Sequence, residues 1–152
     1  MRSTILAAAA CGGIVIGSYA AVSAQPAPKP AAAATVSSAS STPAFAEVLL
    51  RRTEYESELE SLLLDYTEEY PRVKELRYAL GQVRDTESKL LAVKPDDQQR
   101  LTLALGKLLV RRIELEVDLW RLRQTYAASS PDVRRAARRL EIYDRAIRQI
   151  LP

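Results

Sequence analysis

The sequence predicts an all-α protein of four amphipathic helices, arranged as two duplicated helical hairpins. Three observations lead to this fold class. Apolar residues, chiefly Leu and Ala, recur with a seven-residue spacing from Phe45 onward, and prolines with short polar stretches divide that pattern into four segments. The sequence also matches itself when it is shifted so that Arg51 falls on Arg111. Two copies of a helix–proline–helix unit predict a four-helix bundle or an antiparallel coiled coil.

Residues 1–24 predict a secretion signal ahead of the helices. A short positive start that contains Arg2 is followed by the apolar run Ile5 to Val22, and small residues precede a cleavage position after Ala24. Two alternatives stay open: the run remains uncleaved as a membrane anchor, or it is a lipoprotein signal that ends at Cys11. All three place the rest of the chain outside the cytoplasm, in the periplasm or cell envelope, either released or tethered by its N-terminal segment.

Residues 25–44 predict a disordered spacer. The stretch consists mainly of Pro, Ala, Ser and Thr, and Lys29 is its single charged residue. Such a composition cannot form a packed core. We interpret the stretch as a passive tether, while a wall-spanning or O-glycosylated stalk stays open as the alternative.

The helical domain is predicted to span residues 45–152, duplicated as 45–94 and 97–152. The clearest part of the match aligns Arg51-Arg52-Thr53-Glu54-Tyr55-Glu56 with Arg111-Arg112-Ile113-Glu114-Leu115-Glu116, without a gap. In each copy the first Arg is expected to pair with the Glu three residues on, along its own helix. The match also keeps the heptad phase, so the two copies should present the same faces for packing.

The breaks between the segments carry residues that start and end helices. Ser130 and Pro131 predict a helix start, because Ser accepts a bond from free backbone amides and Pro suits the first helical position. Asp96 or Asp97 is expected to cap the third helix. The residue before Pro71 is a poor cap, so this proline marks either a full turn or a kink in one long helix.

Arg52, Glu56, Arg112 and Glu116 are candidate interaction residues. Each Arg precedes its Glu by four residues, the spacing of an ion pair on one helix. Arg52 and Arg112 also fall on heptad a positions, where a charge costs stability unless it is paired and where it acts best as a register device. We therefore predict a buried Arg–Glu layer that joins the two hairpins.

Arg134, Arg135, Arg138 and Arg139 are the other candidate interaction residues, and they make the last helix basic. The first helix is acidic, with eight acidic and two basic residues between positions 45 and 70. We expect these two helices to attract each other if they are adjacent, which would select register more than it would stabilise the fold. The alternative is that the basic helix faces anionic lipid or polysaccharide.

No residue is predicted to be catalytic, to bind a cofactor or to ligate a metal. Histidine is absent and the one cysteine lies in the signal segment, which removes the commonest general base and the soft metal ligands. The sequence contains no Gly-rich phosphate loop and no nucleophile elbow. The formal charge of +3 is too balanced for nucleic-acid binding by bulk charge. One tryptophan and four tyrosines lie at or beside seam positions and are expected in the core: Trp120, Tyr55, Tyr66, Tyr126 and Tyr143.

The motif Tyr66-x-x-x-x-Pro71-x-Val73-x-x-Leu76 resembles the periplasmic coiled coil of the polysaccharide co-polymerases, the chain-length determinants of bacterial surface polysaccharide export. The second copy, Tyr126-x-x-x-x-Pro131-x-Val133, is a looser match. Tyr70 and Ser130 stand where that family often has His. The resemblance implies a related helical module that works beside an envelope machine.

The expected function is that of an exported, non-enzymatic helical scaffold or protein-interaction module of the cell envelope. Its coiled-coil faces would bind a protein partner or a second copy of the chain. One alternative is a periplasmic holdase-like chaperone, which predicts an exposed apolar cradle. The other is an accessory factor that binds the membrane or an envelope polymer, which predicts binding that weakens steeply with salt.

Overall fold

The computed structural model describes residues 39–151, and this part of the chain is helical with no β-strand. Its main elements are α2 (Pro43–Leu63), α3 (Pro71–Leu91), the short 3₁₀ helix η2 (Pro95–Arg100), α4 (Leu103–Thr125) and α5 (Pro131–Ile150). The predicted all-α fold of four main helices is confirmed. The predicted signal and most of the predicted spacer lie outside the described residues. Within residues 39–151, no helix combines the length and apolar character needed to cross a membrane.

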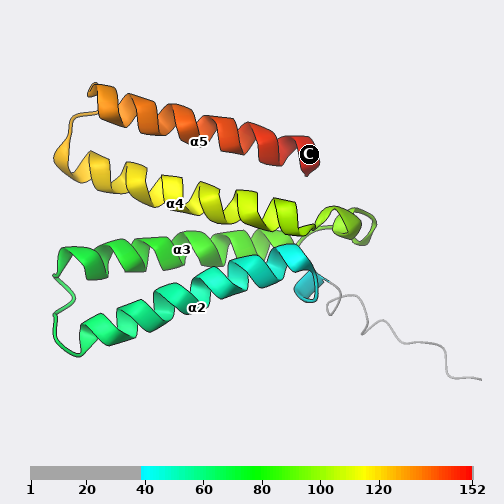
Figure 1. Cartoon of the computed structure of the whole chain (residues 1–152), viewed down its shortest axis with the longest axis horizontal. Helices are drawn as coiled ribbons and strands as arrows, with labels where there is room; N and C mark the ends of the chain where they lie inside the picture. Colours follow the sequence, from blue (N-terminus) through cyan, green and yellow to red (C-terminus); the bar gives the residue numbers. More distant parts are fainter. Residues whose placement is uncertain (1–38, 152) are drawn as a thin grey trace, which may run out of the picture.

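Two antiparallel hairpins, α2–α3 and α4–α5, stack on each other through α4 (Figure 1). α4 packs against α2, α3 and α5, whereas α5 packs extensively against α4 alone. α2 and α5 therefore lie at opposite edges of the stack (Figure 1). The acidic first helix and the basic last helix are therefore not adjacent, and the condition for the expected attraction between them is not met.

α4 separates the two edges because it is apolar on more than one face. Leu105, Leu109, Ile113 and Val117 recur every four residues and belong to the core that α4 shares with the first hairpin. Leu115 is also buried, and it lines a groove together with residues of α5. Apolar surface on both sides of one helix is covered only when that helix lies between two neighbours. The free energy gained by covering this apolar surface outweighs the attraction between exposed charges, which contributes at most about 1 kcal/mol for each pair.

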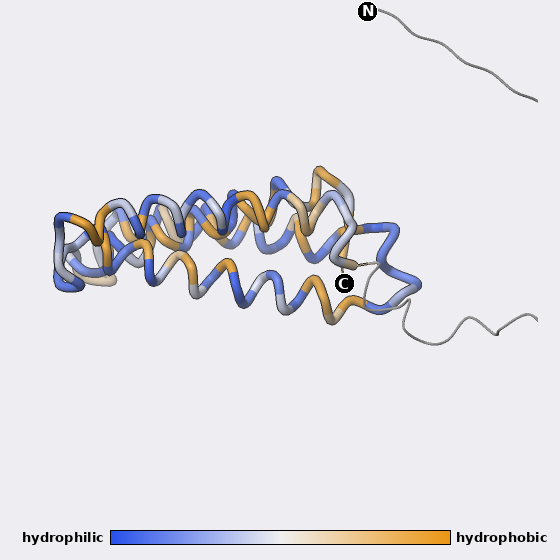
Figure 2. Tube along the Cα trace, turned by 90° about the horizontal axis from the view of Figure 1, so that it is seen from below, coloured by the Kyte–Doolittle hydropathy of each residue, from blue (hydrophilic) through white to orange (hydrophobic). Residues whose placement is uncertain are grey.

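The core lies mainly where α4 meets the first hairpin. Figure 2 shows hydrophobic and hydrophilic residues alternating along the helices, as expected for amphipathic helices that share a core. The first hairpin contributes Ala44, Val48, Ala79, Val83 and Leu90 to this cluster. A smaller cluster within the first hairpin consists of Leu59, Val73, Leu76 and Leu80.

α2 and α4 begin with the same threonine cap, at positions that the repeat matches. The hydroxyl of Thr42 accepts a hydrogen bond from the backbone N–H of Phe45. The hydroxyl of Thr102 accepts one from the N–H of Leu105, and both N···O distances are 3.4 Å. The repeat that is visible in the sequence therefore recurs in the local geometry of the two helix starts.

Two predicted boundaries are corrected by these caps. Asp96 and Asp97 do not cap the third helix, because they lie in η2, and Thr102 takes the N-cap position instead. The predicted spacer extends too far, because Pro43 already begins α2 and Ala44 is fully buried. The polar stretch just before Pro43 thus belongs to a helix start.

Each hairpin turns just before a proline. Pro71 and Pro131 occupy the first positions of α3 and α5, and Pro71 marks a full turn between antiparallel helices, not a kink. The backbone N–H groups of Tyr66 and Tyr126, at matched positions, both bond to the carbonyl four residues earlier at 2.8 Å. Ser130 caps α5 with its side chain, as predicted.

Candidate interaction site

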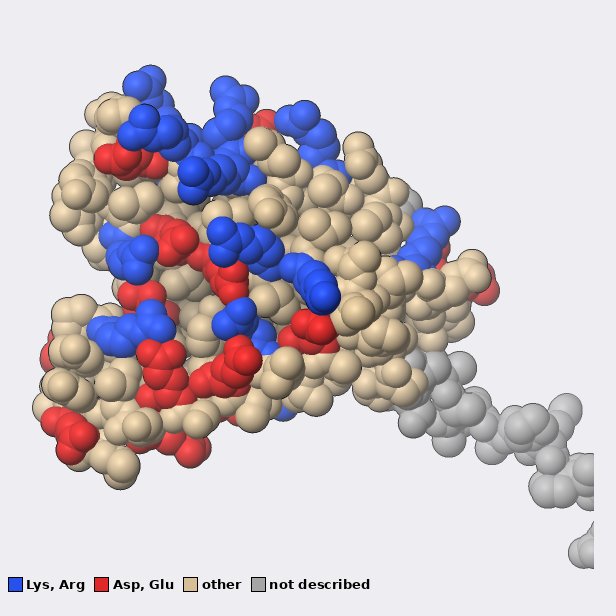
Figure 3. Space-filling model, viewed as in Figure 1, with Lys and Arg blue, Asp and Glu red and all other residues tan. Residues whose placement is uncertain are grey.

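A cleft of about 380 Å³ lies between the two hairpins. Figure 3 shows the hollow on the side of the two hairpin loops, with acidic and basic side chains on its walls. Its apolar lining consists of Leu76, Ala79 and Val117 beside the ring of Tyr55. Its charged lining consists of Arg51, Arg72, Arg111 and Arg121 with Glu75, Glu114 and Asp118. A mixed-charge rim over a small apolar floor suits side chains that carry both kinds of group.

The cleft opens toward the loops because the hairpins approach most closely near the starts of α2 and α4. There Gly106 lies against α2, and a Cβ at this position would be 2.9 Å from both the Cα of Ala44 and the Cβ of Glu47. The backbone N–H of Ala44 also donates to the carbonyl of Leu101 at 3.2 Å. A glycine is therefore required for this close approach of the two helices.

Arg51 joins the two walls of the cleft. Its guanidinium group forms an ion pair with Glu114 of α4 and lies 3.0 Å from the carboxylate of Glu54 on its own helix. Glu114 also accepts a hydrogen bond from Arg111 at 2.8 Å. Arg51 lies over the ring of Tyr55 at 5.4 Å from its centroid. Burial raises the pKa of Tyr55 above its ordinary value, although the nearby Arg51 cation acts in the opposite direction.

A second contact between the hairpins is aromatic. The ring of Tyr78 on α3 stacks on Trp120 of α4, with centroids 5.0 Å apart and planes at 15°. Burial is the main reason why the pKa of Tyr78 is raised, and Glu116 raises it further. Trp120, expected in the core, is half-buried at this stack.

Arg52 pairs within the first hairpin. Its Nη1 lies 2.8 Å from Oε2 of Glu87 on α3, and its Nε lies 3.8 Å from Glu56 on α2. Glu87 is among the few buried charged residues in residues 39–151, with 7% of its surface exposed. The ion pair therefore ties α2 to α3 in a partly desolvated position.

Arg112 pairs within the second hairpin. Its Nε lies 2.7 Å from Asp144 on α5, and its Nη1 lies 2.8 Å from Glu116 on α4. Neither Arg52 nor Arg112 reaches the other hairpin, so the predicted Arg–Glu layer that joins the hairpins does not form. The residues that do join them, Arg51 and Glu114, were expected to pair only along their own helices. Successive residues of a helix point about 100° apart, so the doubled arginines serve two different neighbours.

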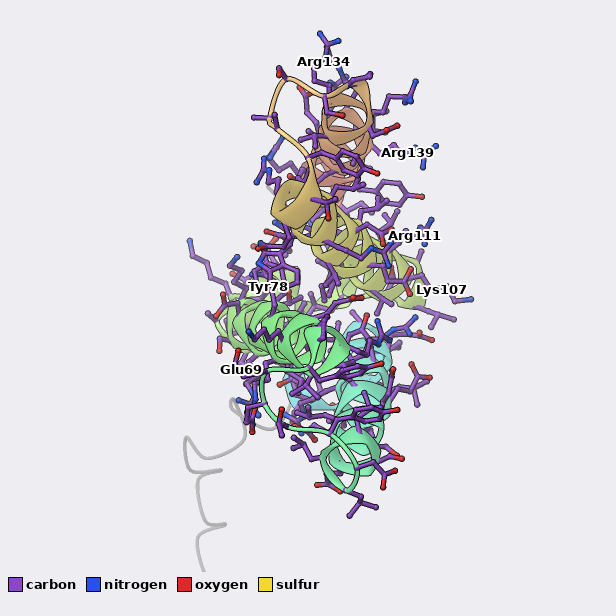
Figure 4. The ribbon with its side chains drawn as sticks, turned by 90° about the vertical axis from the view of Figure 1, so that its left-hand side faces the viewer. Glu69, Tyr78, Lys107, Arg111, Arg134 and Arg139 are labelled. Carbon is purple, nitrogen blue, oxygen red and sulfur yellow. The ribbon has the colours of Figure 1, made fainter. Side chains whose placement is uncertain are left out.

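The arginines of α5 lie on the outside of the stack. Arg135 pairs with Asp132 at 2.6 Å, and Arg138 lies 3.3 Å from Glu141, both along α5 itself. Arg134 and Arg139 form no ion pair with any residue in the range 39–151. Figure 4 shows Arg134 on the side of α5 away from α4 and Arg139 on the flank of α5. The predicted neutralisation of these cations by the first helix therefore does not occur within one chain.

The hairpin loops expose apolar and aromatic side chains beside the cleft. Leu64 is 85% exposed and Tyr126 is 50% exposed. Tyr66 and Tyr70 stack with their ring centroids 4.1 Å apart, and both rings remain accessible to solvent. The expectation that Tyr66 and Tyr126 lie in the core is wrong, because the helices end before these positions and the heptad pattern no longer determines burial.

The geometry offers charge pairing and apolar contact to a ligand. Among residues 39–151, no group of three or more His, Cys, Asp or Glu residues is placed to hold a metal ion. The guanidinium groups of the cleft can form bidentate bonds to carboxylates, and its acidic groups can accept bonds from cations. Comparison of the chain with protein-family models, with curated proteins and with solved structures yields no match.

Proposed function

We propose that the protein is an exported, non-enzymatic helical module of the cell envelope that binds a protein partner at the cleft between its hairpins. The observation that supports this most is the cleft itself, with its walls of mixed charge and its apolar floor. Proteins recognise one another through such a combination of a desolvated apolar centre and a polar rim.

The exposed loop side chains extend this site and indicate what kind of partner fits. Leu64, Tyr66 and Tyr70 belong to the loop between α2 and α3, and Tyr126 belongs to the loop between α4 and α5. Both loops lie at the same end of the molecule (Figure 1). Aromatic residues of this kind are enriched where proteins bind each other. A volume of about 380 Å³ holds a few side chains and not a whole helix. The partner is therefore a protein that inserts side chains of both charges from one face of an amphipathic segment.

The envelope location rests on residues 1–24, whose pattern is that of a secretion signal. Fractionation of the native cell, with an epitope tag at the C-terminus, measures this directly. We expect the chain in the envelope or periplasmic fraction. Its recovery only with cytoplasmic markers would contradict the proposal of export.

The partner is tested by photo-crosslinking in the native cell from Leu64 and from Tyr126, each replaced by a photoreactive phenylalanine. Gln99, an exposed residue of η2 at the far end of the molecule, is the matched control position. We expect one discrete adduct with another protein from both loops and none from Gln99. A broad set of adducts from both loops would favour the holdase-like chaperone. The same adducts from all three positions, or none at all, would contradict a binding site at the cleft.

A further inference from the structure

The repeat leaves a docking stripe of α2 without the cover that its counterpart has. α4 docks on the first hairpin through a stripe of four residues, each at most 8% exposed: Leu105, Leu109, Ile113 and Val117. Their counterparts in the first copy of the repeat are Phe45, Leu49, Thr53 and Ser57, and none of them is buried. At the matching positions of α2, Leu49, Thr53 and Ser57 are exposed, and Phe45 packs in part against the core.

The first two turns of this stripe are apolar. Leu49 is 36% exposed and Leu50 is 56% exposed, and Ala46 beside them is exposed too. The counterpart of Ala46 is Gly106, the point of closest approach between the hairpins. We call Phe45, Ala46, Leu49, Leu50 and Glu54 the α2 outer face. Adjacent exposed leucines on one helix are the kind of surface that is covered by a binding partner.

The second hairpin carries the matching positions, and they are not covered. α4 fills a groove formed by Ala44, Val48, Ala79 and Val83 of the first hairpin. Their counterparts in the second copy of the repeat are Ala104, Leu108, Arg139 and Tyr143, none of them buried. Figure 4 shows Lys107, Arg111 and Arg139 on one side of α4 and α5. We call Ala104, Lys107, Leu108, Arg111, Arg139 and Tyr143 the α4–α5 outer face.

The two outer faces differ in charge. The α2 outer face carries one charged residue, Glu54, whereas the α4–α5 outer face carries Lys107, Arg111 and Arg139. The ion pair between the hairpins also has a counterpart: Arg111 corresponds to Arg51, and Glu54 corresponds to Glu114. Arg111 and Glu54 are about half exposed, at 52% and 51%. Among residues 39–151 each forms ion pairs only along its own helix, and Arg111 also forms a side-chain hydrogen bond with Tyr143 of α5.

We propose that the α2 outer face of one copy docks on the α4–α5 outer face of a second copy, head to tail. The second copy takes the position that a third hairpin would take if the repeat continued. The apolar turns around Leu49 and Leu108 supply the contact, and Arg111 pairs with Glu54 of the next copy. This inference goes beyond the proposed function, since the contact needs no other protein and involves neither of the exposed loops. Arg111 borders both the cleft and the α4–α5 outer face. Contacts of this kind either close into a ring or extend into a chain of copies.

Site-directed crosslinking tests the head-to-tail arrangement. The full chain, with Cys11→Ser, carries Ala46→Cys in one preparation and Lys107→Cys in another, with different affinity tags. In the proposed dimer, Ala46 and Lys107 take the places that Gly106 and Glu47 have within one chain. A Cβ at Gly106 would lie 2.9 Å from the Cβ of Glu47, so the two cysteines should be close enough to crosslink. We expect a short thiol-reactive crosslinker to give a covalent dimer of both tags on mixing. The matched control, Ser88→Cys on the exposed side of α3, should give none with Lys107→Cys.

The outcomes separate this inference from its rivals. Dimers formed by the Ala46→Cys chain with itself would show a symmetric α2–α2 contact and overturn the proposal. The absence of any mixed dimer, with light scattering that gives the mass of one chain at every concentration, would overturn it as well. Mixed dimers without partner adducts at Leu64 would refute the proposed cleft site and leave the head-to-tail contact standing.

A charge swap tests the predicted ion pair. Arg111→Glu and Glu54→Arg should each raise the concentration at half-association by about fivefold, and the double variant should restore it. Equal helicity by circular dichroism shows that each variant is folded. Association that is the same in all four proteins would overturn the Arg111–Glu54 contact.

Discussion

α3 and α5 occupy the same place in the two copies of the repeat, yet they are buried very differently. Both begin at a proline and have nearly equal lengths, 21 and 20 residues. α3 buries eight of its residues, whereas α5 buries only Val133. The cause is the number of close neighbours, because α3 packs extensively against both α2 and α4, while α5 packs extensively against α4 alone. A duplicated sequence thus gives the same helices twice, but burial depends on where each copy lies in the stack.

The sequence reflects this difference at matched positions. Leu76 and Ala79 of α3, both buried, correspond to Ala136 and Arg139 of α5. Ala136 is thus smaller than its counterpart Leu76, and Arg139 is charged where its counterpart is a small apolar residue. Both lie where the groove of the second hairpin is open. These exchanges keep α5 soluble as an edge helix while leaving apolar residues between it and α4.

The largest expected effect comes from truncating one leucine in each copy. Leu80 and Leu140 are matched by the repeat, but Leu80 is 4% exposed and Leu140 is half-buried. Leu80→Ala should lower the free energy of unfolding by about 2–5 kcal/mol. Leu140→Ala should lower it by about 1 kcal/mol, because less contact is lost. Urea unfolding followed by circular dichroism gives both values. Equal losses of stability would contradict the claim that α3 is more deeply buried than α5.

A smaller effect is expected at the contact between the two hairpins. Gly106→Ala places a Cβ 2.9 Å from backbone and side-chain atoms of α2, so the helices must separate at a cost of about 1–3 kcal/mol. Gly81→Ala is the matched control, because a Cβ there meets no atom within 4 Å. It should stabilise α3 by about 0.5–1 kcal/mol through helix propensity. If Gly106→Ala also proved stabilising, the close approach at this end would be contradicted.

The next effect compares the two ion pairs inside the hairpins. Arg52→Ala leaves the carboxylate of Glu87 buried without its partner and should cost about 1–3 kcal/mol. Arg112→Ala leaves Asp144, whose side chain is 29% exposed and can be solvated, and should cost about 1 kcal/mol or less. Chemical denaturation of both variants measures the difference. A larger loss of stability for Arg112→Ala than for Arg52→Ala would contradict the view that the ion pair of the first hairpin costs more to break.

Much of the fold follows from the sequence, because its determinants are local. The heptads, the prolines and the cap at Ser130 predict the helices and their pairing into hairpins. The packing order does not follow, since the charges of the first and last helices favour a contact that the two apolar faces of α4 override. The threonine caps at Thr42 and Thr102 were missed because the nearby prolines and aspartates are the more familiar signals.

The candidate site was less predictable than the fold. The doubled arginine stands out in the sequence, and the heptad pattern assigns the seam position to Arg52. In the structure Arg51, not Arg52, makes the contact between the hairpins. A contact between positions as distant in sequence as Arg51 and Glu114 depends on how two hairpins stack. The hairpins approach closely near Gly106, and the pattern of residues along one helix does not reveal the distance between two helices.

The smallest expected effect is a dependence on alkaline pH at the aromatic stack. Burial raises the pKa of Tyr78 above its ordinary value of 10.0, so the folded state favours the neutral phenol. This contribution to stability is complete below pH 10 and is lost as the pH rises through the raised pKa. Tyr78→Phe removes it, so the variant should lose less stability than the wild type between pH 9 and pH 11. Fluorescence of Trp120, the only tryptophan, follows the unfolding.

The central claim is that α4 fills the groove of the first hairpin, while the matching groove of the second hairpin is open. Hydrogen exchange at two protein concentrations tests this claim most directly. At low concentration we expect the amides of α5 to exchange faster than those of α3 at matched positions. At high concentration, α2 and the α4–α5 outer face should gain protection while α3 stays unchanged. Equal protection of α3 and α5 at both concentrations would show that the two grooves are equally covered within one chain, which would contradict the difference between the hairpins.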